Sequence, residues 1–340
     1  DVSTRLGEDQ CGTLVSYPAR TREEMSKSAL VTGISGQDGS YLAELLLKKG
    51  YDVYGLVRRT STPYRLPAYL NGVHLLYGDL TDSASLSSAV RDSQPDEVYN
   101  LGAMSYVGSS WTHPVSTLDI NTCGVVRLLE AVRQHKREVR VYQASTSEMF
   151  GNQGGRLNEE SVFSPRSPYG ISKVAAHHVI NNYRDSYGMY CCAGICFNHE
   201  SPRRGLEFVT RKITDAVARI AHGLQDEVRL GNMSARRDWG FAGEYVEAMW
   251  LMLQSDEPQD YVIATGETHS VWDFYKLACD CVGIRANAHL VVDSGLARPA
   301  DINELCGDAS KIQRELGWFP IVGFQELVKM MVRADMERYG

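Results

Sequence analysis

The stretch "SALVTGISGQDGSYLAELLLKKGYDVYGLVRR", residues 28–59, carries the strongest fold signal in the chain. It opens with an apolar run, passes through a glycine-rich turn, continues with apolar residues at helical spacing and closes with a second apolar run. This order predicts a strand, a turn, a helix and a second, parallel strand. Glycines at such a turn let the backbone approach a phosphate at the helix N-terminus, where free N–H groups and the helix dipole favour an anion. We therefore predict that Gly33, Gly36 and Gly39 form the pyrophosphate turn of a dinucleotide site, with a purely structural turn as the alternative.

The alternation of strand and helix continues along the chain. Further strands are predicted at residues 74–77, 97–101, 139–143 and 191–197, with helical segments such as 85–93 and 121–135 between them. This pattern predicts an α/β fold with a doubly wound parallel sheet of the Rossmann type and a smaller, interleaved C-terminal substrate lobe. We expect an extension outside the fold at 1–24, the dinucleotide-binding domain at 25–197 with returning segments near 238–270, and mainly the substrate lobe at 198–340.

Composition narrows the classes of function. The 340 residues carry a formal net charge of -7, which argues against a nucleic acid or an anionic membrane as partner. The eight cysteines show no C-x-x-C pair and no His/Cys ligand spacing, so we expect reduced thiols and no metal site. No apolar run approaches the roughly 18 residues of a membrane-spanning helix, and no signal-peptide core precedes the first strand. A cytoplasmic location is therefore expected.

Residues at the ends of the next strands extend the predicted cofactor site. The second strand ends in Arg58 and Arg59, whose guanidinium groups suit a 2′-phosphate, although a solvated pair at a strand end is the alternative. Asp79 ends the third strand, where its carboxylate could accept from an adenine amino group. Small residues at 100–105 permit close approach to a cofactor. The arginine pair favours NADP over NAD, and the regular placement of the other positions after successive strands supports a cofactor site.

Hydroxyl groups and a carboxylate follow the strand predicted at 139–143. The stretch "QASTSEMFG", residues 143–151, places Thr146 and Glu148 just past that strand, at the edge where α/β sheets bind ligands. "PYGISK" then holds Tyr169 and Lys173 four residues apart on one helix face, and an ammonium near a phenol lowers the phenol pKa. These groups form an alcohol-oxidising set. Glu148 goes beyond it, because a carboxylate can remove a proton made acidic by a neighbouring ketone; a surface glutamate is the alternative.

Several cations punctuate the second half of this acidic chain. If the fold gathers them, they would neutralise a diphosphate, whereas an ordinary surface position is the alternative for any single one. They are Arg203, Arg204, Lys212, Arg236, Arg237 and Arg298.

These motifs together resemble the GDP-mannose 4,6-dehydratase family, part of the extended short-chain dehydrogenase/reductase superfamily. Gln37 and Asp38, inside the glycine turn, are more particular to this family than the glycine spacing is. The resemblance covers residue 28 to the C-terminus. It is carried by "TGISGQDGSYLAELLLKKGYDVYGLVRR", "QASTSEMFG", "PRSPYGISK", "FNHESPRRG", "FVTRKIT" and "RDWGFAGEYVEAMWLMLQ".

The resemblance implies a role for each site residue. Thr146, Glu148 and Tyr169 would be catalytic, with Lys173 supporting Tyr169 and the nicotinamide ribose. The residues implied to line NADP are Gly33, Ile34, Ser35, Gly36, Gln37, Asp38, Gly39, Arg58, Arg59, Asp79, Leu80, Leu101, Gly102, Ala103, Ser105, Lys173, His199 and Arg204. Those implied to hold the GDP-sugar are Asn198, Val209, Lys212, Gly231, Asn232, Arg237, Arg298 and Asp301.

The implied reaction converts GDP-mannose to GDP-4-keto-6-deoxymannose by internal redox chemistry with tightly bound NADP, a step toward GDP-deoxyhexoses such as GDP-fucose or GDP-rhamnose. The implied assembly is a homo-oligomer, either a tetramer or a dimer, because the segment after Arg59 that reaches a neighbouring subunit in the family is shorter here. Three alternatives stay open: a GDP-manno-heptose 4,6-dehydratase, a GDP-4-keto-sugar reductase or epimerase, and a non-catalytic NADP sensor.

Overall fold

The computed structural model describes residues 26–60, 70–135, 138–296 and 299–340. The predictions made for residues 1–24, for most of the segment after Arg59 and for Arg298 lie outside these ranges.

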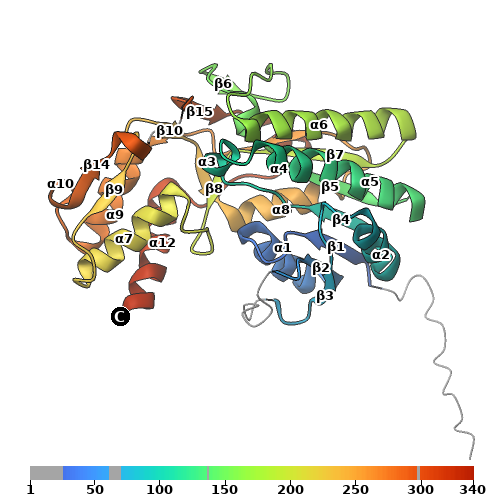
Figure 1. Cartoon of the computed structure of the whole chain (residues 1–340), viewed down its shortest axis with the longest axis horizontal. Coiled ribbons are helices and arrows are strands. Elements are labelled where there is room, and N and C mark those ends of the chain that lie inside the picture. Colours follow the sequence, from blue (N-terminus) through green and yellow to red (C-terminus); the bar gives the residue numbers. More distant parts are fainter. Residues whose placement is uncertain (1–25, 61–69, 136–137, 297–298) are drawn as a thin grey trace, which may run out of the picture.

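A seven-stranded parallel sheet forms the centre of the larger lobe (Figure 1), in the order β12-β7-β5-β4-β1-β2-β3. The order reverses direction between β1 and β4, which is the doubly wound arrangement that the sequence predicted. The last of these seven strands in chain order, β12, joins the sheet at its edge beside β7. The strands are β1 (Ser28–Thr32), β2 (Asp52–Val57), β3 (His74–Tyr77), β4 (Glu97–Asn100), β5 (Arg140–Thr146), β7 (Cys191–Cys196) and β12 (Tyr261–Ile263).

Helices cover both faces of this sheet, as a parallel sheet requires. One core cluster joins the sheet to α2, α5 and α6, and the other joins it to α1, α8 and α11. Most residues of the central strands are therefore apolar, because these strands are buried on both sides. The helices are α1 (Gln37–Lys48), α2 (Ser83–Ser93), α5 (Gly124–His135), α6 (Pro168–Tyr187), α8 (Ala242–Met252) and α11 (Ser310–Leu316), with the short α3 (Val107–Ser110), α4 (Pro114–Leu118) and a π-helical turn (Asp119–Cys123) before α5.

Strand β5 is longer than the sequence predicted. Its pairing with β7 continues through Thr146, which lies opposite Cys196, so Ser145 and Thr146 belong to the strand rather than to the loop after it. The prediction ended the strand at Gln143, and the pairing with the partner strand extends it by three residues.

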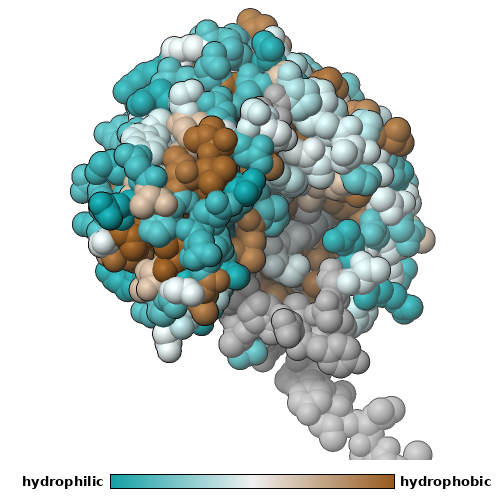
Figure 2. Space-filling model, turned by 60° about the vertical axis from the view of Figure 1, so that its left-hand side comes forward, coloured by the Kyte–Doolittle hydropathy of each residue, from teal (hydrophilic) through white to brown (hydrophobic). Residues whose placement is uncertain are grey.

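The smaller lobe has a core of its own, formed mainly by three helices, α7 (Val209–Ala221), α9 (Val271–Val282) and α12 (Phe324–Tyr339). It lies beyond the end of the large sheet (Figure 1). Where this lobe faces the viewer, Figure 2 shows hydrophilic side chains interrupted by several separate apolar areas. Its remaining elements and those that link the lobes are β6 (Arg156–Leu157), β8 (Asn198–Glu200), β9 (Val228–Leu230), β10 (Arg236–Arg237), β11 (Trp239–Phe241), β13 (His269–Ser270), α10 (Ala286–His289), β14 (Leu290–Val292) and β15 (Glu304–Gly307).

Three further observations concern only the described parts of the chain. None of the helices there is long and apolar enough to cross a membrane. No group of three or more His, Cys, Asp or Glu side chains in those parts could hold a metal ion. The cysteines found there are all free thiols.

Candidate active site

The glycine turn between β1 and α1 is built for close backbone approach. Gly33 has a φ of +68°, and a Cβ there would lie 2.8 Å from the backbone nitrogen of Gly102. A Cβ on Gly39 would lie 2.3 Å from the carbonyl oxygen of Gly33. Gly36, the N-cap of α1, has no side chain that could occupy the free N–H groups of the first turn. The turn therefore leaves the positive end of α1 open to an anion.

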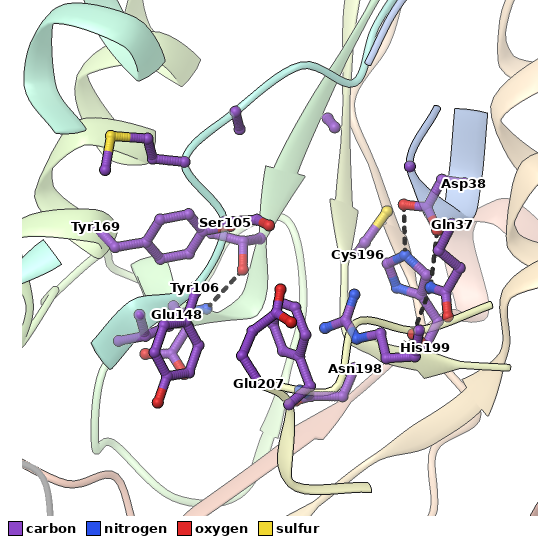
Figure 3. Close-up of a pocket in the computed structure, with 18 of the residues that line it drawn as sticks. Gln37, Asp38, Ser105, Tyr106, Glu148, Tyr169, Cys196, Asn198, His199 and Glu207 are labelled. Carbon is purple, nitrogen blue, oxygen red and sulfur yellow. Dashed lines mark hydrogen bonds and ion pairs between the residues drawn. The ribbon is translucent and has the colours of Figure 1, made fainter. Parts of the chain in front are cut away.

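Gln37 and Asp38, the first residues of α1, connect this turn to β8. The His199 imidazole bridges the two segments: Nε2 lies 2.8 Å from the Asp38 carboxylate and Nδ1 lies 2.7 Å from the Phe197 carbonyl oxygen. The Gln37 amide donates to the carbonyl oxygen of His199 and accepts from the Ser201 hydroxyl. Figure 3 shows these side chains grouped at one end of the cavity.

The charges of this pair stabilise each other. Burial favours the neutral form of Asp38, but the His199 charge and its hydrogen bond outweigh burial and lower the pKa of the carboxyl group to about 2. Burial likewise opposes the charged form of His199, and the Asp38 carboxylate outweighs it and raises the imidazole pKa. Because both ring nitrogens face acceptors, the imidazolium form satisfies every donor.

The end of β5 presents Thr146 and Glu148 to the same cavity. Thr146 is the N-cap of a short 3-10 turn (Ser147–Met149), where its Oγ1 accepts a hydrogen bond of 3.3 Å from the Glu148 N–H. The chain then reverses at Gly151, which has a φ of +67° and lies against the backbone of Ser164. Thr146 and Glu148 are each 9% exposed, so they face the cavity rather than bulk solvent.

Helix α6 brings Tyr169 and Lys173 against this strand end. The Ser167 hydroxyl accepts from the Gly170 N–H and caps the helix, and Pro168 occupies its first turn. A Cβ on Gly170 would lie 2.9 Å from the Glu148 carbonyl oxygen, so the glycine permits the helix to approach the end of β5. The Lys173 ammonium donates to the Ala144 carbonyl oxygen at 2.8 Å.

The pKa values at this helix differ from one expectation. Burial raises the pKa of the Tyr169 phenol, and the hydrogen bond with Thr146 lowers it only in part. Lys173 lies 5.9 Å from the centroid of the Tyr169 ring, and burial lowers its own pKa to about 8. In the protein alone the phenol pKa is therefore raised rather than lowered, because desolvation of the phenolate outweighs the groups that lower this pKa.

Polar groups of the smaller lobe also line the cavity. The Arg237 guanidinium donates to the Ile302 carbonyl oxygen at 2.9 Å and lies 3.7 Å from the Asp301 carboxylate. The Asn232 amide donates to the same carboxylate at 2.9 Å. The Lys212 ammonium faces the cavity, and within the described residues no carboxylate lies within ion-pair distance of it.

Two other cations are directed elsewhere. Arg203 pairs with Glu44 at 2.8 Å and stacks on the Tyr41 ring, and Arg236 pairs with Glu304 at 3.4 Å. Neither lines the cavity. The predicted cationic cluster is therefore smaller than the set of six that the sequence offered.

One cavity of about 610 Å³ brings almost all predicted site residues together. Within the described residues, Ile34 and Arg59 do not line it: the Ile34 side chain is fully buried beneath the turn, and Arg59 is exposed beyond the rim. The predicted residues that line it are Gly33, Ser35, Gly36, Gln37, Asp38, Gly39, Arg58, Asp79, Leu80, Leu101, Gly102, Ala103, Ser105, Thr146, Glu148, Tyr169, Lys173, Asn198, His199, Arg204, Val209, Lys212, Gly231, Asn232, Arg237 and Asp301.

The cavity is also lined by residues that were not among the predicted site residues, including Tyr106, Cys196, Glu207 and Phe208. Figure 3 shows Tyr106 and Glu207 beside Tyr169 and Glu148, at the opposite end from Asp38. Glu207 and Phe208 follow "SPRRG" after Leu206, so their nearness in sequence to Arg204 was the available signal. Tyr106 carried no motif, and its ring meets Phe208 across the lobes at 5.8 Å between centroids.

Comparisons with known proteins agree with this geometry. The family model described as GDP-mannose 4,6 dehydratase matches residues 30–331. GDP-mannose 4,6 dehydratase 1 of Arabidopsis thaliana is 52% identical over 92% of this chain and 90% of its own length. GDP-mannose 4,6 dehydratase of Homo sapiens is 46% identical over 91% of each chain. The structure of Thermus thermophilus UDP-glucose 4-epimerase in complex with NAD superposes with a TM-score of 0.81 and 29% identity, over 90% of this chain and 98% of that chain. The chain belongs to the GDP-mannose 4,6-dehydratase family.

Proposed function

We propose that this protein is a hydro-lyase that converts GDP-D-mannose to GDP-4-keto-6-deoxy-D-mannose, with NADP as a bound cofactor that ends each cycle as it began. The observation that carries the proposal is the position of Glu148. It shares one cavity with Thr146, Tyr169 and Lys173 and with the glycine turn. Alcohol oxidation alone needs no such carboxylate, whereas elimination of water requires a base for C5.

The chain's own residues fit a nicotinamide dinucleotide. The cradle left by Gly33 and Gly39, which a Cβ would fill, and the uncapped N-terminus of α1 suit a pyrophosphate. Arg58 lies at the rim of the cavity directly after β2, where a guanidinium would pair with a 2′-phosphate. This residue supports NADP over NAD.

Oxidation at C4 uses the groups at the start of α6 and the end of β5. Tyr169 removes the proton from the C4 hydroxyl, and Thr146 hydrogen-bonds the same oxygen as it becomes a carbonyl. Lys173, held by the Ala144 carbonyl oxygen, keeps a positive charge 5.9 Å from the centroid of the phenol ring. A bound NADP would supply the redox chemistry, which is hydride removal from C4 and hydride return to C6.

Elimination then depends on Glu148. The 4-ketone acidifies the C5 proton, which the Glu148 carboxylate removes while a double bond forms between C5 and C6. The C6–O bond breaks, and protonated Glu148 gives its proton to the departing hydroxyl, so that water leaves. When hydride reaches C6, C5 takes up one proton, which balances the proton that Tyr169 took from the C4 hydroxyl. Because Glu148 is 9% exposed, few waters compete with the substrate for its carboxylate.

The part of the cavity that the smaller lobe lines would hold the GDP portion of the substrate. Lys212 and Arg237 face the space that a diphosphate would occupy, and each brings a positive charge into a half-buried site. Asn232 and Asp301, already joined by a hydrogen bond of 2.9 Å, offer an amide and a carboxylate to a base or ribose.

The test is incubation of the purified protein with GDP-mannose without added reductant, followed by NMR of the sugar. We expect a new C6 methyl signal and loss of one water per sugar. A Glu148→Gln variant should bind GDP-mannose normally and lose roughly 10²- to 10⁴-fold in turnover, whereas Glu160→Gln, an exposed loop control, should match wild type. Turnover of Glu148→Gln at the wild-type rate would contradict the assigned role. Faster turnover of GDP-manno-heptose would favour that alternative, and consumption of stoichiometric NADPH would favour a reductase.

The cofactor preference has a separate test. Nucleotide released from the denatured protein should be NADP or NADPH, and an Arg58→Ala variant should lose most of the preference for NADP over NAD. Equal binding of both cofactors by wild type would contradict the assignment to Arg58.

A further inference from the structure

From Ser145, which lines the cavity, a line of polar groups continues through His177 to Asp260, and the reaction as described does not use it. The Ser145 hydroxyl lies 3.3 Å from His177 Nδ1, and His177 Nε2 lies 3.6 Å from the Asp260 carboxylate. Ser145 and His177 are each 5% exposed. Burying polar groups costs free energy unless they form hydrogen bonds, so the partners of these three side chains are informative.

The line ties the two catalytic segments together. Tyr169, Lys173 and His177 are spaced four residues apart along α6, so they form one stripe on the helix. Lys173 donates to the carbonyl oxygen of Ala144, and His177 contacts the hydroxyl of Ser145, the next residue of β5. Helix α6 is thus fastened to two consecutive residues of β5 directly before Thr146.

The charge of Asp260 influences which ring nitrogen of His177 carries the proton. Its carboxylate accepts from the Arg184 guanidinium at 2.6 Å and from the Ala193 N–H at 2.7 Å, so it is held in place as an acceptor before β12. The 3.6 Å between His177 Nε2 and this carboxylate is longer than a hydrogen bond, but an ionised carboxylate attracts an N–H and cannot donate, so the proton of a neutral His177 is favoured on Nε2. Nδ1 is then an acceptor, and the Ser145 O–H is the donor.

The surroundings keep His177 neutral. Burial lowers the imidazole pKa, and it outweighs the Asp260 carboxylate, which raises it; His178 and Arg184 on the same helix lower it further. The edge of the Phe163 ring packs against the imidazole with 5.1 Å between centroids, which leaves little room for ring rotation. The imidazole is thus fixed in both tautomer and orientation.

We propose that His177, oriented by Asp260, is a positioning residue that holds the end of β5 against α6 through Ser145, and so sets Thr146 and Glu148 relative to Tyr169. This inference rests on the proposed function. A shift between the two segments would separate the groups that act on C4 from the carboxylate that acts on C5, and it would leave the GDP-binding end of the cavity unchanged. The expected signature is therefore a fall in kcat with little change in KM.

The first measurement does not depend on activity. Protein labelled with ¹⁵N at histidine is examined by NMR at pH 7, and the His177 ring signals are assigned by their loss in a His177→Asn variant. We expect a neutral ring with the proton on Nε2. A proton on Nδ1, or an imidazolium, would overturn the hydrogen-bond direction and with it the proposal.

The second measurement compares two substitutions that keep different halves of the imidazole. The Asn oxygen can take the place of Nδ1 as acceptor for Ser145, whereas the Gln amide can reach only the position of Nε2. We expect His177→Asn to stay within about threefold of wild-type kcat and His177→Gln to fall roughly 10- to 100-fold, both with KM near wild type. Asn182→Gln, at an exposed position further along α6, is the control.

The outcomes separate this inference from the proposed function. If wild type forms no 4-keto product from any GDP-sugar, the proposed function fails, while the NMR measurement still tests the polar line. If wild type is active and His177→Gln turns over at the same rate, the positioning role is excluded. Equal losses in His177→Asn and His177→Gln that follow their melting temperatures would likewise reduce the line to a structural contact and overturn the proposal.

Discussion

The ion pair between Asp38 and His199 offers the most quantitative test of the site, through the substitution Asp38→Asn. This change keeps the shape of the side chain and removes its charge at the entrance of the glycine turn. Asp38 lies 2.8 Å from His199, and its side chain is only 21% exposed, so the interaction is weakly screened.

The magnitude follows from the carboxyl pKa, which falls from its ordinary value of 3.8 to about 2. Each pKa unit corresponds to about 1.4 kcal/mol, so the charged form is favoured by roughly 2 kcal/mol. Interaction between two sites is reciprocal, and the His199 pKa should therefore fall in Asp38→Asn, because the carboxylate that raises it is gone. It should drop below its ordinary value of 6.5, because burial then acts without the carboxylate.

The pair also predicts how stability depends on pH. The lowered pKa of Asp38 contributes stability above its unfolded value, and this is lost as the pH falls toward about 2. The raised pKa of His199 contributes stability below 6.5, and this is lost as the pH rises through the folded value. The pair should therefore stabilise the protein most between about pH 4 and 6.5.

The assay is an NMR titration of histidine ring signals in wild type and in Asp38→Asn, together with urea unfolding at pH 6 and pH 9. Asp92→Asn, an exposed aspartate on α2, is the control and should leave the His199 titration unchanged. An unchanged His199 pKa in Asp38→Asn, or a loss of stability that is the same at both pH values, would show that the two charges are not coupled in this way.

Two further predictions follow from close packing and from a buried charge. Gly39→Ala places a Cβ 2.3 Å from a backbone oxygen, an overlap that costs about 1 to 3 kcal/mol unless the turn opens. Fluorescence titration with NADPH should therefore show binding at least roughly tenfold weaker. Gly323→Ala, in open space at the start of α12, is the control and should bind NADPH normally. Arg211→Ala leaves Asp335 buried beside a lost guanidinium between α7 and α12, so the free energy of unfolding should fall by about 3 kcal/mol or more; a change under about 0.5 kcal/mol, typical of surface sites, would contradict this.

Much of the nucleotide-binding half was predictable because its signals are local. The turn at Gly33 to Gly39 is encoded by glycines within a few residues of one another, and parallel strands buried on both faces appear as short apolar runs. The same logic placed Thr146, Glu148 and Tyr169 near one sheet edge, since successive parallel strands end on the same side.

The rest depended on partners far apart in the chain. The end of β5 moved to Thr146 because of pairing with β7, and Arg203 left the cationic cluster because Glu44 and Tyr41 on α1 hold it. No local pattern encodes such contacts.

Short-range spacing along the chain was enough to specify the fold class, the phosphate turn and the types of group available for catalysis. Three features emerged only from the folded arrangement: which cations face the cavity, which direction the pKa of Tyr169 takes, and that His177 on α6 meets Ser145 on β5 and Asp260 before β12. Burial and long-range pairing set these features, and both arise only when distant segments of the chain pack together.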